Sequence, residues 1–392
     1  MLTLADANRS LQLKNPVSIS YPSLLSAPST LSRSIGTPVS QPVLKTTIHN
    51  PSRITDKAFG SGPDCLGVLI VRDLPRRYQG LRERLLRLSH AFAQLDQSVR
   101  ENYADAKSRY SFGWSHGKEI MNGKPDTLKG SYYANPVMDV PSVHPNLQEA
   151  YPEYYGTNIC ECHILSHRQH SVSSILGPKD EKGIEGFEPA FKELGSFVFD
   201  VGVKLAAACQ PFASSYLTDS SLSLSTLISS QTTKARLLHY FPPSPEKSLL
   251  AEDEPIDSWC GFHVDHSLLT GLCSALFIQH TPGAPPKVIS SPSPSSGLYI
   301  RTRGGELTKV TIPPDCLAFQ TGETLELATA GRLRATPHCV RMGAGDGSEY
   351  VSRETFALFM QPDVNQQISE TETFGEFSKR IFDDHYNDVN IQ

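Results

Sequence analysis

The chain has 392 residues, enough to bury a large core, and its formal net charge is −5 with acidic and basic residues interspersed. The sequence contains no basic stripe, which argues against nucleic acid as a partner, and no apolar run near the roughly 20 residues that a membrane-spanning helix needs. The eight cysteines include no CxxC pair and the N-terminus lacks the layout of a secretory signal, so we expect reduced thiols in a cytoplasmic protein.

Residues 1–60 are rich in Ser, Thr and Pro and show little periodicity, so we expect this segment to be mostly disordered or loosely ordered. Within it, residues 18–25 (SISYPSLL) could form a short edge strand and a turn. The Ser-rich, acid-poor stretch 18–53 leaves an organellar targeting peptide open as an alternative.

Residues 61–230 are predicted to form a helix-rich part of the same domain. An apolar, β-rich run (CLGVLIVRDLP) begins at Cys65 and predicts a buried strand. Apolar residues then recur at three- and four-residue steps over residues 80–103 and again over residues 186–213. This spacing is typical of amphipathic helices, and we expect the two helices to pack as one layer.

Two segments between these helices carry side chains suited to chemistry. Trp114, His116 and Lys118 lie in an aromatic, glycine-containing stretch, and they are candidates either for lining a substrate pocket or for packing the loop. The sequence CECHILSHRQH could in principle form a second metal site, but its spacing matches no structural zinc pattern and a polar loop is favoured. Its metal-ligating residues are Cys160, Cys162, His163, His167 and His170.

Residues 231–392 are predicted to form a β-rich core. Short strands punctuated by Gly and Pro follow one another after Lys234, which is typical of a jelly roll or a barrel. Two Pro- and Ser-rich inserts interrupt the series and are interpreted as surface loops. Residues 370–386 look like a closing helix.

Three residues of this core are candidate metal ligands and catalytic residues. His263 and Asp265 lie two positions apart in a predicted strand, so their side chains project from one face, and His338 follows in a later strand. Two imidazoles and one carboxylate on one face of a metal leave the other face open, as in iron(II) sites that bind a cosubstrate and dioxygen. His266 points to the opposite face and is predicted to be packed or hydrogen-bonded.

Arg353 and Thr355 are also two positions apart in a predicted strand. A guanidinium and a hydroxyl on one face suit the terminal carboxylate of a dicarboxylic acid whose other end chelates the metal. Taken singly, an arginine on an exposed strand face is the simpler interpretation. The order of the elements, HxD first, then the distal His, then RxT, favours the binding role.

The segments HVDHSLLTGL, GLYIRTRGGELTKVTIPPDCLAFQTGETLELATAGRLRATPHCVR and SRETFALFMQPD resemble, in this order, the isopenicillin N synthase-like family of 2-oxoglutarate and iron(II)-dependent oxygenases. The resemblance covers roughly residues 63–385 and implies an α+β fold with a clavaminate synthase-like double-stranded β-helix, or jelly-roll, core. Helices from the N-terminal half would flank this core, and a C-terminal helix would close it.

The resemblance also implies roles for the site residues. Iron(II) would be held by the His-x-Asp pair and the distal His, and 2-oxoglutarate by Arg353 with Thr355, which stands where the family usually has Ser. RLLHYFPP resembles a strand that carries an Asn-x-Tyr in the family, and His239 and Phe241 are expected at those positions. Tyr240 is a candidate substitute for the tyrosine that contacts the cosubstrate.

The activity that follows from the resemblance is an iron(II)- and 2-oxoglutarate-dependent dioxygenase. It would oxidise a small organic substrate, with hydroxylation as the expected outcome, and release succinate and CO2. Dioxygen would be consumed, ascorbate is a candidate reductant, and a monomer is expected. Two alternatives remain: an iron(II) oxidase of the same fold that does not use 2-oxoglutarate, and a non-catalytic small-molecule binding or sensor protein.

Overall fold

A computed structural model describes residues 15–26, 51–121, 124–158, 181–243, 259–341 and 350–386. The Cys- and His-rich sequence between residues 160 and 170 lies outside them, so its predicted loop stays a prediction. Within these ranges, none of the helices combines the length and apolar character that crossing a bilayer requires.

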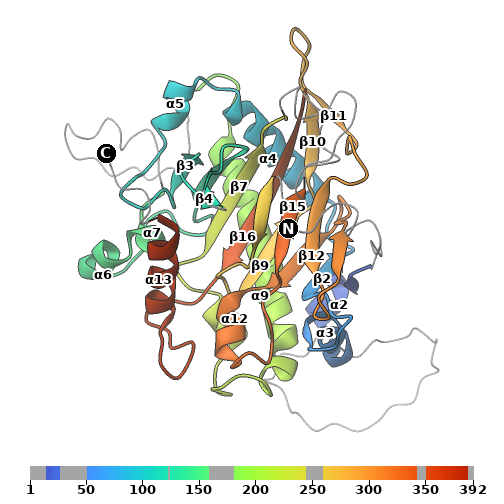
Figure 1. Cartoon of the computed structure of the whole chain (residues 1–392), viewed down its shortest axis with the longest axis vertical. Helices are drawn as coiled ribbons and strands as arrows, with labels where there is room; N and C mark the ends of the chain where they lie inside the picture. Colours follow the sequence, from blue (N-terminus) through green and yellow to red (C-terminus); the bar gives the residue numbers. More distant parts are fainter. Residues whose placement is uncertain are drawn as a thin grey trace.

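The described strands form two sheets and one small hairpin (Figure 1). The main sheet has the order β1-β2-β14-β9-β16-β7-β6-β3, and β10 and β11 extend it beside β16. Its pairings are antiparallel except for the parallel pair β1 and β2. The strands are β1 (Val17–Ser20), β2 (Val68–Arg72), β3 (Gly113–His116), β6 (Lys129–Ala134), β7 (Lys234–Tyr240), β9 (Leu269–Cys273), β10 (Leu276–Gln279), β11 (Lys287–Ile289), β14 (Leu317–Thr321) and β16 (Val351–Met360).

The second sheet is smaller and entirely antiparallel, with the order β13-β12-β15-β8. Its strands are β8 (Cys260–His263), β12 (Gly297–Arg301), β13 (Leu307–Val310) and β15 (His338–Arg341), and β4 (Ile120–Met121) with β5 (Lys124–Pro125) makes the hairpin. Buried apolar residues of both sheets meet in one cluster, which includes Leu238 and Ala357 of the main sheet and Ile300 and Val340 of the second. The two sheets are therefore the layers of the predicted jelly roll, and the α+β fold is confirmed.

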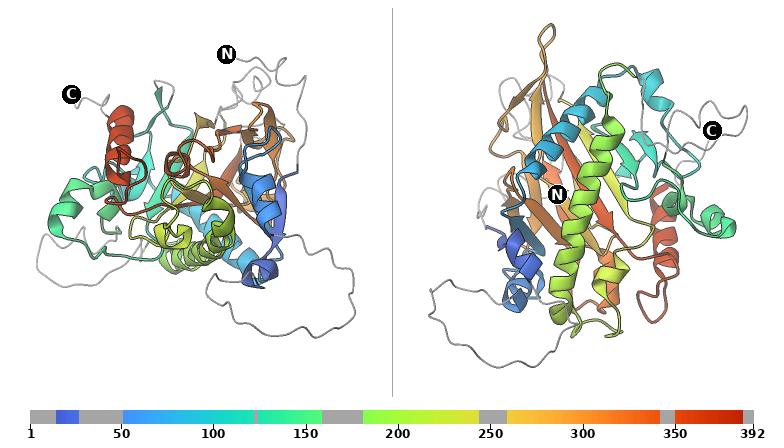
Figure 2. Two further views of the ribbon diagram at one scale, coloured as in Figure 1. Left: turned by 90° about the horizontal axis from the view of Figure 1, so that it is seen from below. Right: turned by 180° about the vertical axis from the view of Figure 1, so that it is seen from behind.

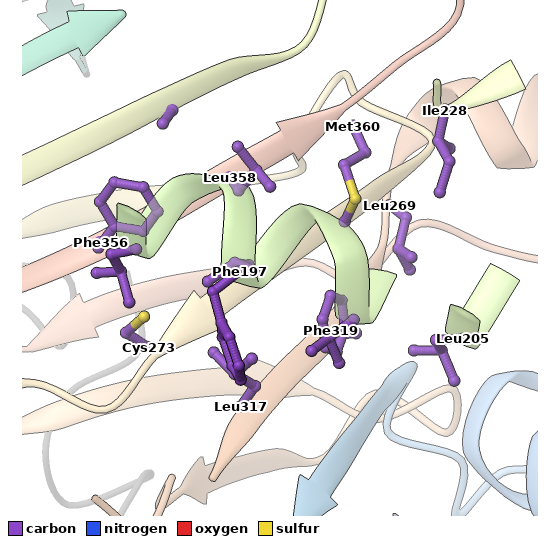
Figure 3. Close-up of a cluster of buried hydrophobic side chains, with 14 of the residues drawn as sticks. Phe197, Leu205, Ile228, Leu269, Cys273, Leu317, Phe319, Phe356, Leu358 and Met360 are labelled. Atoms are coloured by element: carbon purple, nitrogen blue, oxygen red, sulfur yellow. The ribbon is translucent and has the colours of Figure 1, made fainter. Parts of the chain in front are cut away.

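Two helices cover the other face of the main sheet. α4 (Arg77–Ala93) and α9 (Phe187–Ala213) lie side by side there (Figure 2), which confirms the predicted helical layer. Figure 3 shows Phe197 of α9 pointing toward Leu317 of the sheet. The periodicity over residues 80–103 continues past α4, but the chain forms a separate short helix there, α5 (Gln97–Glu101).

The N-terminal segment is more ordered than expected where it is described. β1 pairs with β2, α2 (Tyr21–Ser26) follows at once, and α3 (Pro51–Phe59) packs against α9. The edge strand considered for residues 18–25 is present as β1, followed by a helix instead of a turn. The expectation of loose order does not hold for α3, because Ala58 and Phe59 are buried in the main core. The main sheet also takes strands from both sides of residue 230, so residues 61–230 and 231–392 build one sheet together.

A third apolar cluster closes one end of the molecule. α13 (Phe374–Tyr386), which agrees with the predicted closing helix, places Phe374 and Phe377 against Tyr154 and Tyr155. Figure 1 shows α13 beside α7 (Pro152–Tyr155). The remaining described helices are α6 (Pro145–Ala150), α7 (Pro152–Tyr155), α10 (Leu224–Leu227) and α12 (Glu323–Ala328).

Candidate active site

The pairing of β8 with β15 brings two of the predicted metal ligands together. His263 and His338 are directly opposite each other in the register, and their ring centroids are 4.2 Å apart. Asp265 lies two residues beyond the end of β8, and its Oδ1 is 3.9 Å from His263 Nε2 and 3.8 Å from His338 Nε2. The three side chains are close enough to share one ion.

Backbone carbonyls determine which ring nitrogen of each histidine carries the proton. His263 Nδ1 lies 2.8 Å from the carbonyl oxygen of Gly261, and His338 Nδ1 lies 2.9 Å from that of Thr336. A carbonyl only accepts hydrogen bonds, so each Nδ1 carries the proton and each Nε2 presents its lone pair toward Asp265. Burial lowers the pKa of both imidazoles, which favours the neutral form that binds metals.

Gln320 orients the carboxylate of Asp265. Its Nε2 donates to Asp265 Oδ2 over 2.5 Å, which leaves Oδ1 facing the histidines. Burial alone would raise the pKa of Asp265, but His338 and His263, together with hydrogen bonds from Thr270 and Gln320, hold it below its usual value. The sequence interpretation missed Gln320, although an amide among the apolar residues of β14 was a usable signal.

A cavity of about 200 Å³ between the two sheets joins the three side chains to the predicted carboxylate anchor. His263, Asp265 and His338 line it from one side, and Arg353 and Thr355 line it from β16 of the main sheet. The two predicted groups of site residues therefore share one cavity, although they come from different sheets.

Arg353 is a buried cation with unused donors. Its Nε and Nη1 are buried and have no hydrogen-bond partner among the described residues. The guanidinium carbon lies 4.9 Å from the centroid of the Tyr240 ring, and the Thr355 hydroxyl donates to the carbonyl of Cys273 over 3.2 Å. Buried donors without partners are destabilising, so this geometry is suited to an anion that enters the cavity.

The placement of Tyr240 corrects one expectation. Arg236, Leu238 and Tyr240 line the cavity, whereas His239 faces the helical layer, where it contacts Glu354. Contrary to the expectation, His239 and Phe241 therefore do not hold the cavity-facing positions of the strand. The reason is the alternation of side chains in β7, whose register sets Tyr240 opposite Arg353. Burial raises the pKa of Tyr240 to about 12, so its hydroxyl stays protonated.

The other conspicuous residues lie away from the cavity. Trp114 is buried against Phe92, with ring centroids 5.2 Å apart. His116 Nε2 lies 3.0 Å from the carbonyl oxygen of Thr127, and Lys118 makes an ion pair with a glutamate of α5. None of the three lines this cavity, so the alternative that they line a substrate pocket gains no support from it. His266 Nδ1 lies 3.2 Å from Glu323 Oε2, which confirms its prediction as a hydrogen-bonded residue.

Comparison with known proteins supports the fold. No model of a known protein family matches the chain, and no curated protein matches it. A solved structure of a candidate 2OG-Fe(II) oxygenase family protein from Caulobacter crescentus has a TM-score of 0.60 at 16% identity, covering 96% of this chain and 100% of the other. A full-length Neurospora crassa protein, solved in complex with alpha-KG, has a TM-score of 0.57 at 14% identity, covering 91% of this chain and 87% of the other.

JOX2, solved in complex with 2OG, Fe and JA, has a TM-score of 0.54 at 12% identity, covering 95% of this chain and 86% of the other. At these identities the likeness establishes the fold. The chain therefore has the jelly-roll fold of structures that include 2-oxoglutarate and iron-dependent oxygenases.

Proposed function

We propose that the protein is an iron(II)- and 2-oxoglutarate-dependent dioxygenase that oxidises a small organic substrate, and that it belongs to the isopenicillin N synthase-like branch. One observation carries the proposal. A single cavity contains two Nε2 lone pairs and a carboxylate oxygen directed at one point, and it also contains a buried guanidinium with two unbonded nitrogens. The two Nε2 atoms and the carboxylate oxygen fit a metal ion, and the guanidinium fits an anion. A dicarboxylate that chelates the metal with one end needs both.

The donor set of His263, Asp265 and His338 fits iron(II). Imidazole nitrogens suit this ion, and two histidines with one carboxylate are the ligand set of non-haem iron oxygenases. When bound, iron(II) would supply the redox chemistry for activating dioxygen, and ascorbate is the proposed reductant that keeps it in this state. The protein holds each ligand in one orientation through Gly261, Thr336 and Gln320, so little reorganisation is needed on binding.

Arg353 and Thr355 would bind the distal carboxylate of 2-oxoglutarate. The two free guanidinium nitrogens supply donors, and the Thr355 hydroxyl can turn from the carbonyl of Cys273 to the ligand. The Tyr240 ring supports the guanidinium from the side. Leu272, Phe277 and Ala357 also line this cavity, and such apolar walls limit the access of water to a bound anion.

The first test is an anaerobic titration of the purified protein with iron(II) and then 2-oxoglutarate, following the visible charge-transfer band of the chelate. We expect the band in the wild type and its loss in His263→Ala. In Arg353→Ala the band should require far more 2-oxoglutarate. Iron binding without a band at high 2-oxoglutarate would favour the oxidase alternative, and no iron binding would contradict the enzyme assignment.

Matched controls lie close by. His266→Ala removes a histidine next to the proposed ligands whose ring contacts Glu323 and not the cavity. Arg100→Ala removes an arginine stacked on Trp114, 5.5 Å from guanidinium carbon to ring centroid, outside the cavity. Both controls should give the wild-type band. Loss of the band in a control would point to a general loss of structure.

A further inference from the structure

The strand that carries the carboxylate anchor also carries a buried acid on its opposite face. Glu354 lies between Arg353 and Thr355 on β16 and is fully buried beneath α4. Its carboxylate lies within hydrogen-bond distance of residues from three elements. His239 Nδ1 lies 2.8 Å from Oε1, the Ser352 hydroxyl donates to the same oxygen over 2.8 Å, and the Ser89 hydroxyl donates to Oε2 over 2.8 Å.

The protons of this network can be assigned from its chemistry. An ionised carboxylate only accepts, so His239 Nδ1 and both serine hydroxyls are donors. With the Ser352 proton directed at Glu354, His90 Nδ1 donates to Ser352 Oγ over 3.0 Å. His90 Nε2 then accepts from His280 Nδ1, 3.3 Å away. The hydrogen bonds therefore run from the half-buried His280 through His90 and Ser352 to Glu354.

His90, His239 and Glu354 also lie close enough together to hold a metal ion. The hydrogen bonds argue against this use. An ion shared by the three side chains would have to displace the Nδ1 proton of His239, and it would separate Ser352 from both His90 and Glu354. The existing partners already satisfy the carboxylate, which is the usual condition for burying one.

The network lies directly behind the anchor. Glu354 is opposite His239 in the β16–β7 register, and the next pair along is Arg353 opposite Tyr240. The hydrogen bond from His239 to Glu354 therefore joins the two strands one residue away from the contact between Arg353 and the Tyr240 ring. Side chains at successive positions point to opposite faces, so one face of this strand pair holds the network and the other holds the anchor.

We propose that Glu354 and His239 are positioning residues that hold Arg353 in the orientation that binds the distal carboxylate of the cosubstrate. This inference rests on the proposed function. Ser89 and His90 tie the same strand pair to α4, which ties the anchor to the helical layer as well. Loss of the network would let β16 and β7 shift relative to each other, and small displacements of a binding group have large effects on affinity.

The test is the affinity for iron(II) and for 2-oxoglutarate, measured separately by anaerobic titration in wild type, Glu354→Gln and Ser378→Ala. Ser378 is a matched control because its buried hydroxyl donates to Tyr154 over 2.6 Å in the cluster around α13. We expect Glu354→Gln to weaken 2-oxoglutarate binding about tenfold or more, with iron affinity changed less than about twofold. Ser378→Ala should leave the affinities for iron(II) and for 2-oxoglutarate unchanged. A general loss of packing would not weaken the binding of one ligand selectively.

Where Glu354→Gln does not fold, Ser89→Ala serves instead, because it removes a single donor, and about a threefold loss of 2-oxoglutarate affinity is expected. Unchanged 2-oxoglutarate affinity in a folded variant would overturn the positioning role alone. Failure of the wild type to bind 2-oxoglutarate would overturn the proposed function together with this inference. A second metal ion per chain that Glu354→Gln loses would also overturn it, because the cluster would then be a metal site.

Discussion

Arg353 and Tyr240 face each other across β16 and β7, with the guanidinium carbon 4.9 Å from the ring centroid. Changing the Tyr240 ring should therefore change how strongly Arg353 binds the proposed cosubstrate carboxylate. We expect Tyr240→Leu to weaken 2-oxoglutarate binding about tenfold, because a desolvated cation–π contact is worth about 1–2 kcal/mol. Tyr240→Phe keeps the ring and should stay within about threefold of wild type. Isothermal titration of the iron-loaded protein without oxygen measures the 2-oxoglutarate affinity of both variants. Equal losses of affinity in the two variants would contradict a role for the ring.

Gln320 offers a test of the proposed metal site that leaves every proposed ligand in place. Gln320→Leu removes the donor to Asp265 Oδ2, so the carboxylate is free to turn away from the histidines. We expect iron(II) affinity to fall about 10- to 100-fold. The control is Gln361→Leu, a buried amide whose Nε2 donates to the carbonyl of Thr232 over 2.6 Å, outside the cavity. Competition with a chelator measures the affinity, and equal effects of both changes would contradict the orienting role.

Glu354 predicts how stability depends on acid pH. Burial alone would raise its pKa, but His239 and His90 outweigh burial and lower the pKa from 4.5 to about 2. A lowered pKa in the folded state gives stability that is fully present above about pH 4.5 and is lost as the pH falls toward 2. The contribution is on the order of 3 kcal/mol.

Urea unfolding of the metal-free protein at pH 7 and pH 3 measures this effect. Glu354→Gln should be less stable than wild type at pH 7 and should lose less stability between the two pH values. Glu83→Gln changes a half-exposed carboxylate on the surface of α4 and should retain the wild-type pH dependence. A Glu354→Gln curve parallel to that of wild type would show that this carboxyl titrates normally.

Gly271 tests the packing of the helical layer on the main sheet. A methyl group at this position in β9 would lie 2.7 Å from Val198 Cγ1 of α9 and 3.0 Å from a ring atom of Phe319. Gly271→Ala should therefore reduce the free energy of unfolding by about 1–3 kcal/mol. The methyl group added by Gly80→Ala in α4 would meet no atom within 4 Å, so this change should increase the free energy of unfolding by about 0.5–1 kcal/mol. Denaturant unfolding compares the two, and destabilisation by both would contradict the packing argument.

Much of the architecture could be predicted from local sequence patterns. The amphipathic repeat indicated α9 and most of α4, and a series of short strands indicated the jelly roll. These patterns can be read from the sequence because each element buries one of its faces, and this sets the spacing of its apolar residues. The orientation of Tyr240 was not readable, because a register shift of one residue reverses every side chain of a strand. Only the pairing of β7 with β16 shows which face of the strand meets the cavity.

The candidate site divides in the same way. The donor types and their pairwise spacing are visible in the sequence, because His263 with Asp265 and Arg353 with Thr355 lie two residues apart. How the pairs come together depends on the pairing of strands that are distant in the sequence. Pairing of β15 with β8 places His338 beside His263, while distant elements supply Gln320 and the Ser89 and His239 partners of Glu354. Such contacts depend on long-range packing, and short sequence patterns carry no information about it.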